Sequence, residues 1–215
     1  MEVFAGTQEG GKMKTLIGIP CMDMVHTGFF KAFTDLNKAG ASYTVLQNTL
    51  IHDSRNIIAA NAIKAGFDRI MWFDSDMTFE PDTLERLSAD MDTGLDFVTG
   101  VYYTRKPPKI RPVIYKELWW DLQENGEVYS GATNFTDYPE GIFEIAGAGF
   151  GCCLTSVDLI KRVGDEFGSP FAPIHGMGED LSFCWRVQQI GAKMYCDGGV
   201  QCGHIGQFVY NKEWK

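Results

Sequence analysis

A run of apolar residues that ends in two aspartates constrains the fold of this chain more than any other feature. Ile70-Met71-Trp72-Phe73 predicts a strand buried on both faces, as in a parallel sheet covered by helices. Asp74 and Asp76 follow at positions i and i+2, which places both carboxylates on the same side of an extended chain. Because ligands bind at the carboxyl ends of such strands, the pair suits a divalent cation that also carries a substrate's phosphates.

The same spacing elsewhere in the chain has a simpler interpretation. Asp90 and Asp92 end a predicted helix, where a solvated surface turn is expected. Asp74 and Asp76 differ because they follow an apolar strand. A helix is predicted to begin near Pro81, so capping of that helix is the alternative role for these two aspartates.

The composition predicts one folded unit without a membrane span. With 215 residues, of which 45% are hydrophobic, the chain can bury one sizeable core. The net charge of −9 provides no basic surface for nucleic acid or anionic membranes, and no apolar run is long enough to span a bilayer. We predict a flexible leader at 1–13 without signal-peptide features, followed by a single cytoplasmic domain at 14–215.

The six cysteines are scattered along the chain and contain no Cys-x-x-Cys pair. Disulfide frameworks are typical of smaller secreted proteins, so reduced and buried thiols are predicted. Cys196, Cys202 and His204 form an alternative set of zinc ligands. Without a paired cysteine motif, buried thiols are the favoured interpretation.

Apolar periodicity predicts an α/β fold with a mostly parallel central sheet flanked by helices. The predicted strands lie at 15–20, 42–46, 69–73, 96–100, 143–146 and 193–196. The predicted helices lie at 28–39, 53–66, 81–91, 156–163 and 179–190. Right-handed crossovers between the first strands would cover the sheet with helices. Trp119, Trp120 and a turn at Gly126 predict a small antiparallel hairpin.

Two irregular segments contain candidate ligand-binding residues. Residues 101–112 combine three prolines with the cations Arg105 and Lys106, which predicts either a mobile lid over phosphates or a surface loop. The alternating glycines of 147–151 allow the backbone to approach a ligand closely or to fit a tight bend. They lack the spacing of a dinucleotide fingerprint, and the chain contains no Gly-x-x-x-x-Gly-Lys phosphate loop.

Two acidic residues and a histidine in the last fifth of the chain are further candidates. Glu179 and Asp180 begin a predicted helix, where the helix dipole favours carboxylates. One of them can therefore face a cleft while its neighbour caps the helix or pairs with a cation. His204 lies between Gly203 and Gly206, outside any apolar periodicity, and is a candidate third ligand beside the two aspartates.

Together these elements resemble a GT-A fold glycosyltransferase, similar to family 2 and its phage-borne and bacterial relatives. The resemblance rests on the strand that ends in Asp74-Ser75-Asp76, on Glu179-Asp180 followed by Trp185-Arg186, and on the trailing His204. It implies a Rossmann-like single domain that moves a sugar from a nucleotide-diphosphate sugar to an acceptor hydroxyl. It also implies Mn²⁺ or Mg²⁺ as cofactor, with UDP as the favoured nucleotide.

The resemblance assigns roles to individual residues. Asp76 and His204 would bind the metal, and Asp74 would contact the metal or the ribose of the donor. Asp180 matches the general base of inverting members, with Glu179 beside it as the second catalytic carboxylate. The other substrate-binding candidates are Pro20 at the end of the first strand, Arg55, Ser75, Arg105, Lys106, Gly149 and Trp185.

Two other functions compete with this hypothesis. A nucleotidyltransferase that makes sugar nucleotides also uses carboxylate-bound metal, but it carries a glycine-rich and basic loop where this chain has Cys21-Met22-Asp23-Met24. A non-catalytic carbohydrate-binding relative would use Trp119 and Trp120 as a stacking platform. Because the chain is short, a glycan, a small molecule and a modified nucleic-acid base all stay open as acceptors, and the sequence favours no oligomeric state.

Overall fold

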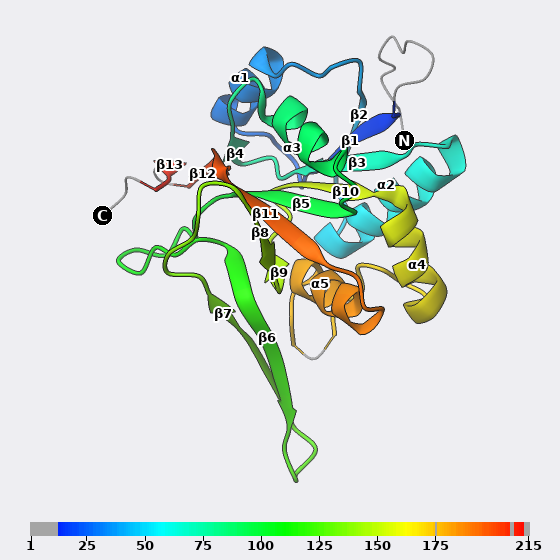
Figure 1. Ribbon diagram of the computed structural model, residues 1–215, viewed down its shortest axis with the longest axis vertical. Coiled ribbons are helices and arrows are strands. Elements are labelled where there is room, and N and C mark those ends of the chain that lie inside the picture. Colours follow the sequence, from blue (N-terminus) through cyan, green and yellow to red (C-terminus); the bar gives the residue numbers. More distant parts are fainter. Residues whose placement is uncertain (1–12, 175, 207–208, 213–215) are drawn as a thin grey trace.

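The computed structural model describes residues 13–174, 176–206 and 209–212, so the predicted leader, apart from Met13, lies outside the described residues. Its core is a seven-stranded sheet with the strand order β2-β1-β3-β10-β5-β11-β8 (Figure 1). These strands are β1 (Thr15–Pro20), β2 (Ser42–Leu46), β3 (Arg69–Phe73), β5 (Phe97–Val101), β8 (Ile142–Ile145), β10 (Cys152–Ser156) and β11 (Met194–Gln201).

The sheet is mostly parallel, as predicted. β1 pairs in parallel with β2 and β3, and β5 pairs in parallel with β11. β10 lies antiparallel between β3 and β5, so those two strands share a direction without touching, and β8 is an antiparallel edge strand. No strand was predicted at 152–156, because a short apolar run after a glycine-rich segment has no periodicity that separates strand from helix.

In the described part of the chain, five helices flank the sheet: α1 (Thr27–Asp35), α2 (Ile51–Ala65), α3 (Thr83–Met91), α4 (Val157–Phe167) and α5 (Glu179–Gln189). Alternate residues of β3 belong to two separate hydrophobic clusters. Trp72 packs in the cluster of α2, α4 and α5, whereas Phe73 packs in the cluster of α1 and α3. Because successive side chains of a strand point to opposite faces, the helices cover both faces of the sheet.

Several helix ends follow the signals in the sequence, whereas α2 begins two residues before the predicted 53 and α4 extends to Phe167, past the predicted 163. α2 ends at Gly66, whose φ of 71° is the left-handed conformation that glycine adopts without strain. Ser156 caps α4, and its Oγ accepts the N–H of Leu159 at 3.0 Å. α1 ends at Asp35 and not at the predicted residue 39, and the chain turns through Ala39 with a φ of 49°.

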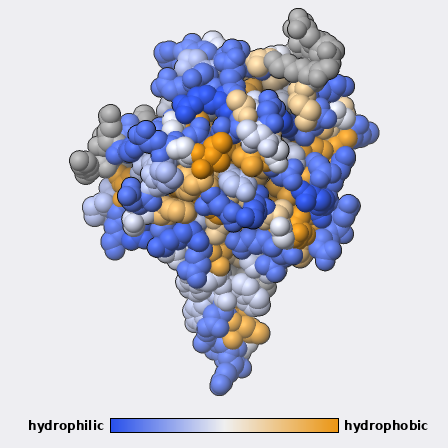
Figure 2. Space-filling view, in the orientation of Figure 1, coloured by the Kyte–Doolittle hydropathy of each residue, from blue (hydrophilic) through white to orange (hydrophobic). Residues whose placement is uncertain are grey.

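Two small sheets complete the fold. The first pairs β7 (Val128–Asn134), β6 (Ile114–Leu122) and β9 (Gly147–Ala148), and its β6–β7 hairpin projects from the body of the protein (Figure 1). This confirms the predicted hairpin, whose turn contains Gly126 with a φ of 83°. Figure 2 shows an apolar patch near the tip of the hairpin, where Leu122 and Val128 form an exposed cross-strand pair.

The second small sheet pairs β13 (Val209–Tyr210), β12 (Gly203–Ile205) and β4 (Met77–Thr78). It joins the segment that follows β3 to the end of the described chain. Within the described ranges, none of the helices has the length and apolar character needed to cross a membrane.

Candidate active site

The carboxyl end of β3 and the β4–β12 pairing bring Asp76 and His204 together. Met77, the first residue of β4, lies opposite His204 in the antiparallel ladder, and the Ile205 N–H donates to the Asp76 carbonyl at 2.7 Å. The His204 Nε2 consequently lies 3.6 Å from the Asp76 Oδ2. The sequence predicted both residues for one site, and the structure places them side by side.

His204 is oriented by a backbone contact on its other ring nitrogen. Its Nδ1 lies 2.8 Å from the carbonyl oxygen of Tyr103, which can only accept a hydrogen bond. The Nδ1 therefore donates this hydrogen bond, which turns Nε2 toward Asp76. Metal-binding histidines are commonly held in this way.

Asp76 has one oxygen with a partner and one without. Its Oδ2 accepts a hydrogen bond from the Arg105 Nη1 at 2.7 Å, whereas its Oδ1 is buried and has no partner among the described residues. Burial alone would raise the pKa of Asp76, but the nearby His204 and Arg105 outweigh it and the pKa is lowered. An ionised carboxylate with an unused buried oxygen, beside an oriented imidazole nitrogen, fits a divalent cation.

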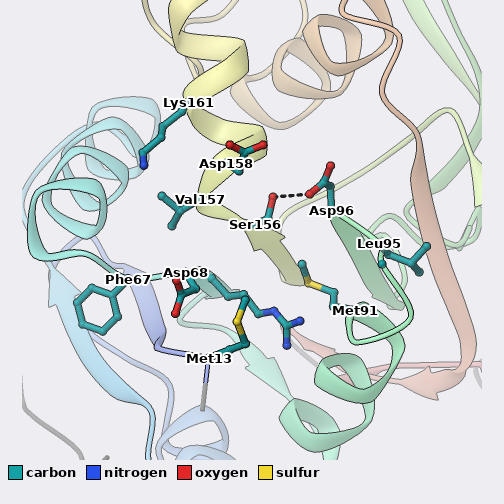
Figure 3. Close-up of a pocket in the computed structure, with 12 residues that line it drawn as sticks. Met13, Phe67, Asp68, Met91, Leu95, Asp96, Ser156, Val157, Asp158 and Lys161 are labelled. Atoms are coloured by element: carbon teal, nitrogen blue, oxygen red, sulfur yellow. Dashed lines mark hydrogen bonds between the residues drawn. The ribbon is translucent and has the colours of Figure 1, made fainter. Parts of the chain in front are cut away.

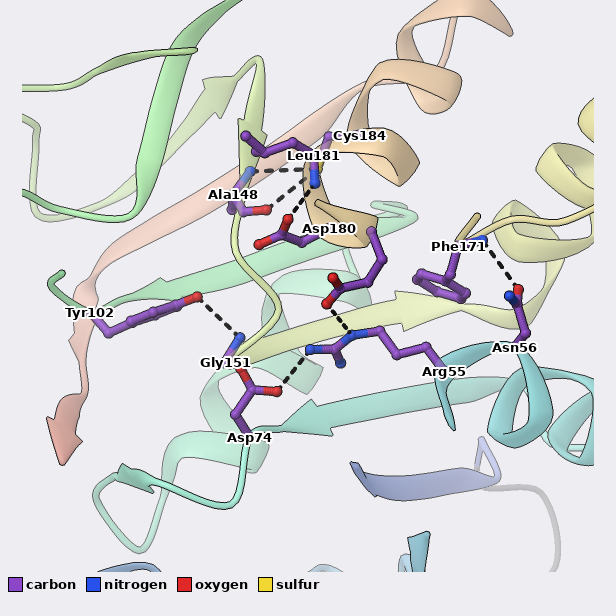
Figure 4. A network of polar contacts seen from close by, with 11 residues as sticks. Arg55, Asn56, Asp74, Tyr102, Ala148, Gly151, Phe171, Asp180, Leu181 and Cys184 are labelled. Atoms are coloured by element: carbon purple, nitrogen blue, oxygen red, sulfur yellow. Dashed lines mark hydrogen bonds and ion pairs between the residues drawn. The ribbon is translucent and has the colours of Figure 1, made fainter. Parts of the chain in front are cut away.

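Asp74 belongs to a different set of contacts, shown in Figure 4. Its Oδ1 accepts a hydrogen bond from the Arg55 Nη2 at 2.8 Å, and the Arg55 Nε donates to the Glu179 Oε1 at 3.2 Å. Asp74 is thus turned toward an arginine, while Asp76 faces the histidine. Among the described residues, no three His, Cys, Asp or Glu side chains cluster as a metal site. Of the predicted metal ligands Asp74, Asp76 and His204, the structure brings Asp76 and His204 together.

Arg55 is a fully buried cation with one unused donor. Only 1% of its surface is exposed, and its guanidinium lies over the rings of Trp72 and Phe150 at 5.6 and 5.2 Å. Burial lowers the pKa of Arg55, but the carboxylates of Asp74 and Glu179 outweigh it and raise the pKa overall. The Nη1 of Arg55 is buried and has no partner within the described structure. Arg55 therefore fixes both carboxylates and leaves its Nη1 unpaired within the described structure.

Asp180 has the properties of a proton acceptor near neutral pH. It follows Glu179 in the first turn of α5 and accepts the N–H of Leu181 at 2.7 Å. Burial, followed by the charge of Glu179, raises the pKa of Asp180 from 3.8 to about 6. A carboxylate with such a pKa can hold or release a proton within the physiological range.

Tyr102 contacts both His204 and the glycine-rich segment at 147–151, and it was not predicted from the sequence. Its hydroxyl accepts the N–H of Gly151 at 3.3 Å, and its ring meets that of His204 edge-on with 5.3 Å between centroids. A Cβ at Gly149 would lie 1.9 Å from the Tyr102 hydroxyl oxygen, so this glycine makes room for the ring. The alternating glycines were the available signal, because they predicted a close approach without naming what approaches.

The other predicted substrate-binding residues lie in varied places. Pro20 is buried at the end of β1, and the Ser75 carbonyl accepts the N–H of His26 at 3.2 Å. Lys106 is exposed on the loop that carries Arg105. Trp185 packs against Phe167 of α4, with 6.0 Å between ring centroids. Five positions along a helix from Asp180, Trp185 points about 140° away from it, so the structure does not bring these two residues together.

The sequence offered two interpretations of the cysteines: buried thiols and a zinc site with His204. All six cysteines are free and buried, as predicted, and Cys196, Cys202 and His204 do not form a metal cluster in the described chain.

A cavity of about 380 Å³ lies at the amino ends of the strands, beside Asp68 before β3, Asp96 before β5 and Lys161 of α4 (Figure 3). Ligands of α/β sheets bind at the carboxyl ends of the strands, so this cavity is not the expected substrate site.

The central sheet, the flanking helices and the small antiparallel sheets together form a GT-A-like α/β fold. No protein-family model matches the sequence, and a comparison with curated proteins finds no match. Solved structures are similar in fold.

A197 from STIV superposes with a TM-score of 0.62 and 18% identity over 90% of this chain and 86% of that chain. GalNAc-T7, solved with UDP, GalNAc and Mn²⁺, superposes with a TM-score of 0.56 and 12% identity over 96% of this chain. The match spans 45% of GalNAc-T7, less than half its length. At such identities the likeness concerns the fold.

Proposed function

We propose that this protein is a metal-dependent glycosyltransferase that uses a nucleotide-diphosphate sugar, with UDP as the favoured nucleotide. The observation that carries the proposal is the pairing of Asp76 and His204 with an unused carboxylate oxygen. Asp180, whose pKa is raised to about 6, supplies a further carboxylate. The fold shared with GalNAc-T7, which was solved with UDP, GalNAc and Mn²⁺, supports the proposal.

On the donor side, Asp76 and His204 would hold Mn²⁺ or Mg²⁺, with the Tyr103 carbonyl fixing the imidazole. A bound divalent cation stabilises the negative charge that gathers on the departing diphosphate. Arg105 and Lys106 supply further positive charge from the loop. Asp74, held by Arg55, would accept hydrogen bonds from the ribose.

On the acceptor side, Asp180 would take the proton of the attacking hydroxyl. Proton removal by a positioned carboxylate contributes about 10²–10⁴-fold to such reactions. A base that activates the acceptor opposite the leaving diphosphate gives inversion at the anomeric carbon. Glu179 is engaged by Arg55, which leaves Asp180 as the carboxylate available for the acceptor.

Calorimetric titration of UDP with and without Mn²⁺, followed by assays of UDP-sugar hydrolysis, tests the proposal. We expect UDP to bind in a Mn²⁺-dependent manner, and Asp76→Asn to remove the dependence without unfolding the protein. Asp180→Asn should bind UDP and Mn²⁺ normally but lower kcat by about 10²-fold or more, because it removes an interaction made in the transition state. Metal-independent UDP binding in both wild type and Asp76→Asn would overturn the assignment.

A non-catalytic carbohydrate-binding role is the second candidate, because the projecting hairpin exposes two tryptophans. Trp119 and Trp120 are 44% and 41% exposed, and the ring of Trp119 lies directly over Gly131 of β7. Flat, exposed rings of this kind stack on sugars. A binding protein would retain glycan affinity and show no turnover in either wild type or Asp180→Asn.

A further inference from the structure

The loop that leaves β5 extends an arginine into the candidate metal site. The Arg105 Nη1 donates to the Asp76 Oδ2 at 2.7 Å and to the Ile205 carbonyl oxygen at 2.8 Å. Asp76 is the carboxylate that the proposed function assigns to the cation, and the His204 Nε2 lies 3.6 Å from the same oxygen, Oδ2. A positive side chain therefore already neutralises the carboxylate that the cation would use, at the oxygen nearest the histidine.

The loop can release Arg105 without losing its own support. Its stem is held by the Thr104 N–H, which donates to the Arg111 carbonyl at 2.9 Å, and by the Val113 N–H, which donates to the Tyr102 carbonyl at 2.8 Å. Arg105 directly follows Thr104 in this stem, and its side chain is 41% exposed. Swinging this side chain away from Asp76 leaves the stem and the Tyr103 contact to His204 in place.

Resting on the proposed function, we propose that Arg105 exchanges partners when the donor binds. In the free protein it neutralises Asp76, and in the complex it moves to the diphosphate of the nucleotide while the cation takes Asp76. A guanidinium and a divalent cation on one carboxylate repel each other, so each weakens the binding of the other. The diphosphate offers the guanidinium an anionic partner that matches its fork of donors.

The exchange couples the cation to the nucleotide. Without nucleotide, Arg105 competes with the cation for Asp76, and the cation binds weakly. With nucleotide, Arg105 has another partner and the competition ends. Because such coupling is reciprocal, Mn²⁺ raises the affinity for UDP by the same factor by which UDP raises the affinity for Mn²⁺. Arg105 is in this scheme a specificity-determining residue that reserves the site for the metal–nucleotide pair.

The test measures Mn²⁺ binding by calorimetry, alone and with saturating UDP, in wild type, Arg105→Ala, Lys109→Ala and Asp76→Asn. Lys109→Ala is the matched control because it removes the same charge from another exposed residue of the loop, to which the proposed function assigns no role. We expect Arg105→Ala to bind Mn²⁺ alone about tenfold more tightly than wild type. The variant lacks the half-exposed ion pair between Arg105 and Asp76 that competes with the cation, and it lacks the repulsion between the guanidinium and the cation. The same variant should lose most of the gain in Mn²⁺ affinity that UDP provides.

Mn²⁺ also binds UDP in solution, but this contribution is the same for every variant and cancels in the comparison. Unchanged or weaker Mn²⁺ binding in Arg105→Ala would overturn the exchange, as would an equal tightening in Lys109→Ala. If Asp76→Asn is the one variant that abolishes Mn²⁺ binding, this result supports the proposed metal site. If the wild type and Arg105→Ala bind neither Mn²⁺ nor UDP, the proposed function fails and the exchange fails with it.

Discussion

Replacing Asp180 with asparagine is expected to stabilise the folded protein above pH 6 although it removes the proposed base. The pKa of Asp180 rises from 3.8 to about 6 on folding, because of burial and then the charge of Glu179. Between these two pH values the folded state binds more protons than the unfolded state, so stability falls as the pH rises. The shift of roughly two pH units corresponds to about 3 kcal/mol.

Asparagine avoids this cost because it is neutral at every pH. Its Oδ1 can still accept the Leu181 N–H, which lies 2.7 Å from Asp180 in the wild type. Asp180 keeps part of its surface in contact with solvent, so we expect a gain of about 1–3 kcal/mol at pH 8. The gain should shrink as the pH falls through 6 and vanish below about pH 4.

Urea unfolding of wild type and Asp180→Asn across this pH range measures the effect. Asp74→Asn is the matched control with the opposite sign, since it removes a charged partner of the buried Arg55. Breaking a buried ion pair costs about 3–5 kcal/mol, and the remaining Glu179 partner places the expected loss near the lower end. A pH-independent difference, or destabilisation of Asp180→Asn at pH 8, would refute the proposed cause of the raised pKa.

Three further outcomes are expected. The transfer rate of the wild type should rise with pH through about 6 as Asp180 loses its proton, and a pH–rate profile without this rise would exclude it as the base. Gly149→Ala should lose about 1–3 kcal/mol in thermal unfolding, since its Cβ would lie 1.9 Å from the Tyr102 hydroxyl, whereas Gly141→Ala, with open space around its Cβ, should not. UDP with Mn²⁺ should slow hydrogen exchange at 102–112, and equal exchange rates with and without these ligands would leave the segment an ordinary surface loop.

Local pattern was sufficient for much of the fold. The apolar run at 70–73 predicted β3 as a buried strand, and Gly66 and Gly126 predicted a helix end and a hairpin turn. Each of these depends on a few consecutive residues, whose hydrophobic period or left-handed glycine conformation is independent of the rest of the chain. The same kind of signal placed Glu179 at the start of α5.

The sequence also identified residues of the site without their partners. Asp74 and Asp76 were predicted as a pair, but Asp74 faces Arg55 and Asp76 faces His204 and Arg105. The spacing of two residues put both carboxylates at the strand end, and only the neighbouring elements decided what each one meets. Arg55 and Glu179 are 124 residues apart, a contact that no local pattern contains.

Tertiary structure alone decided the remaining features. The insertion of β10 between β3 and β5 depends on pairing between distant segments. The raised pKa of Asp180 depends on burial by elements packed around α5, and Tyr102 enters the site because Gly149 leaves room for its ring. Composition and periodicity determine which segments become strands and helices, whereas desolvation and charge pairing at the site arise only when those segments pack together.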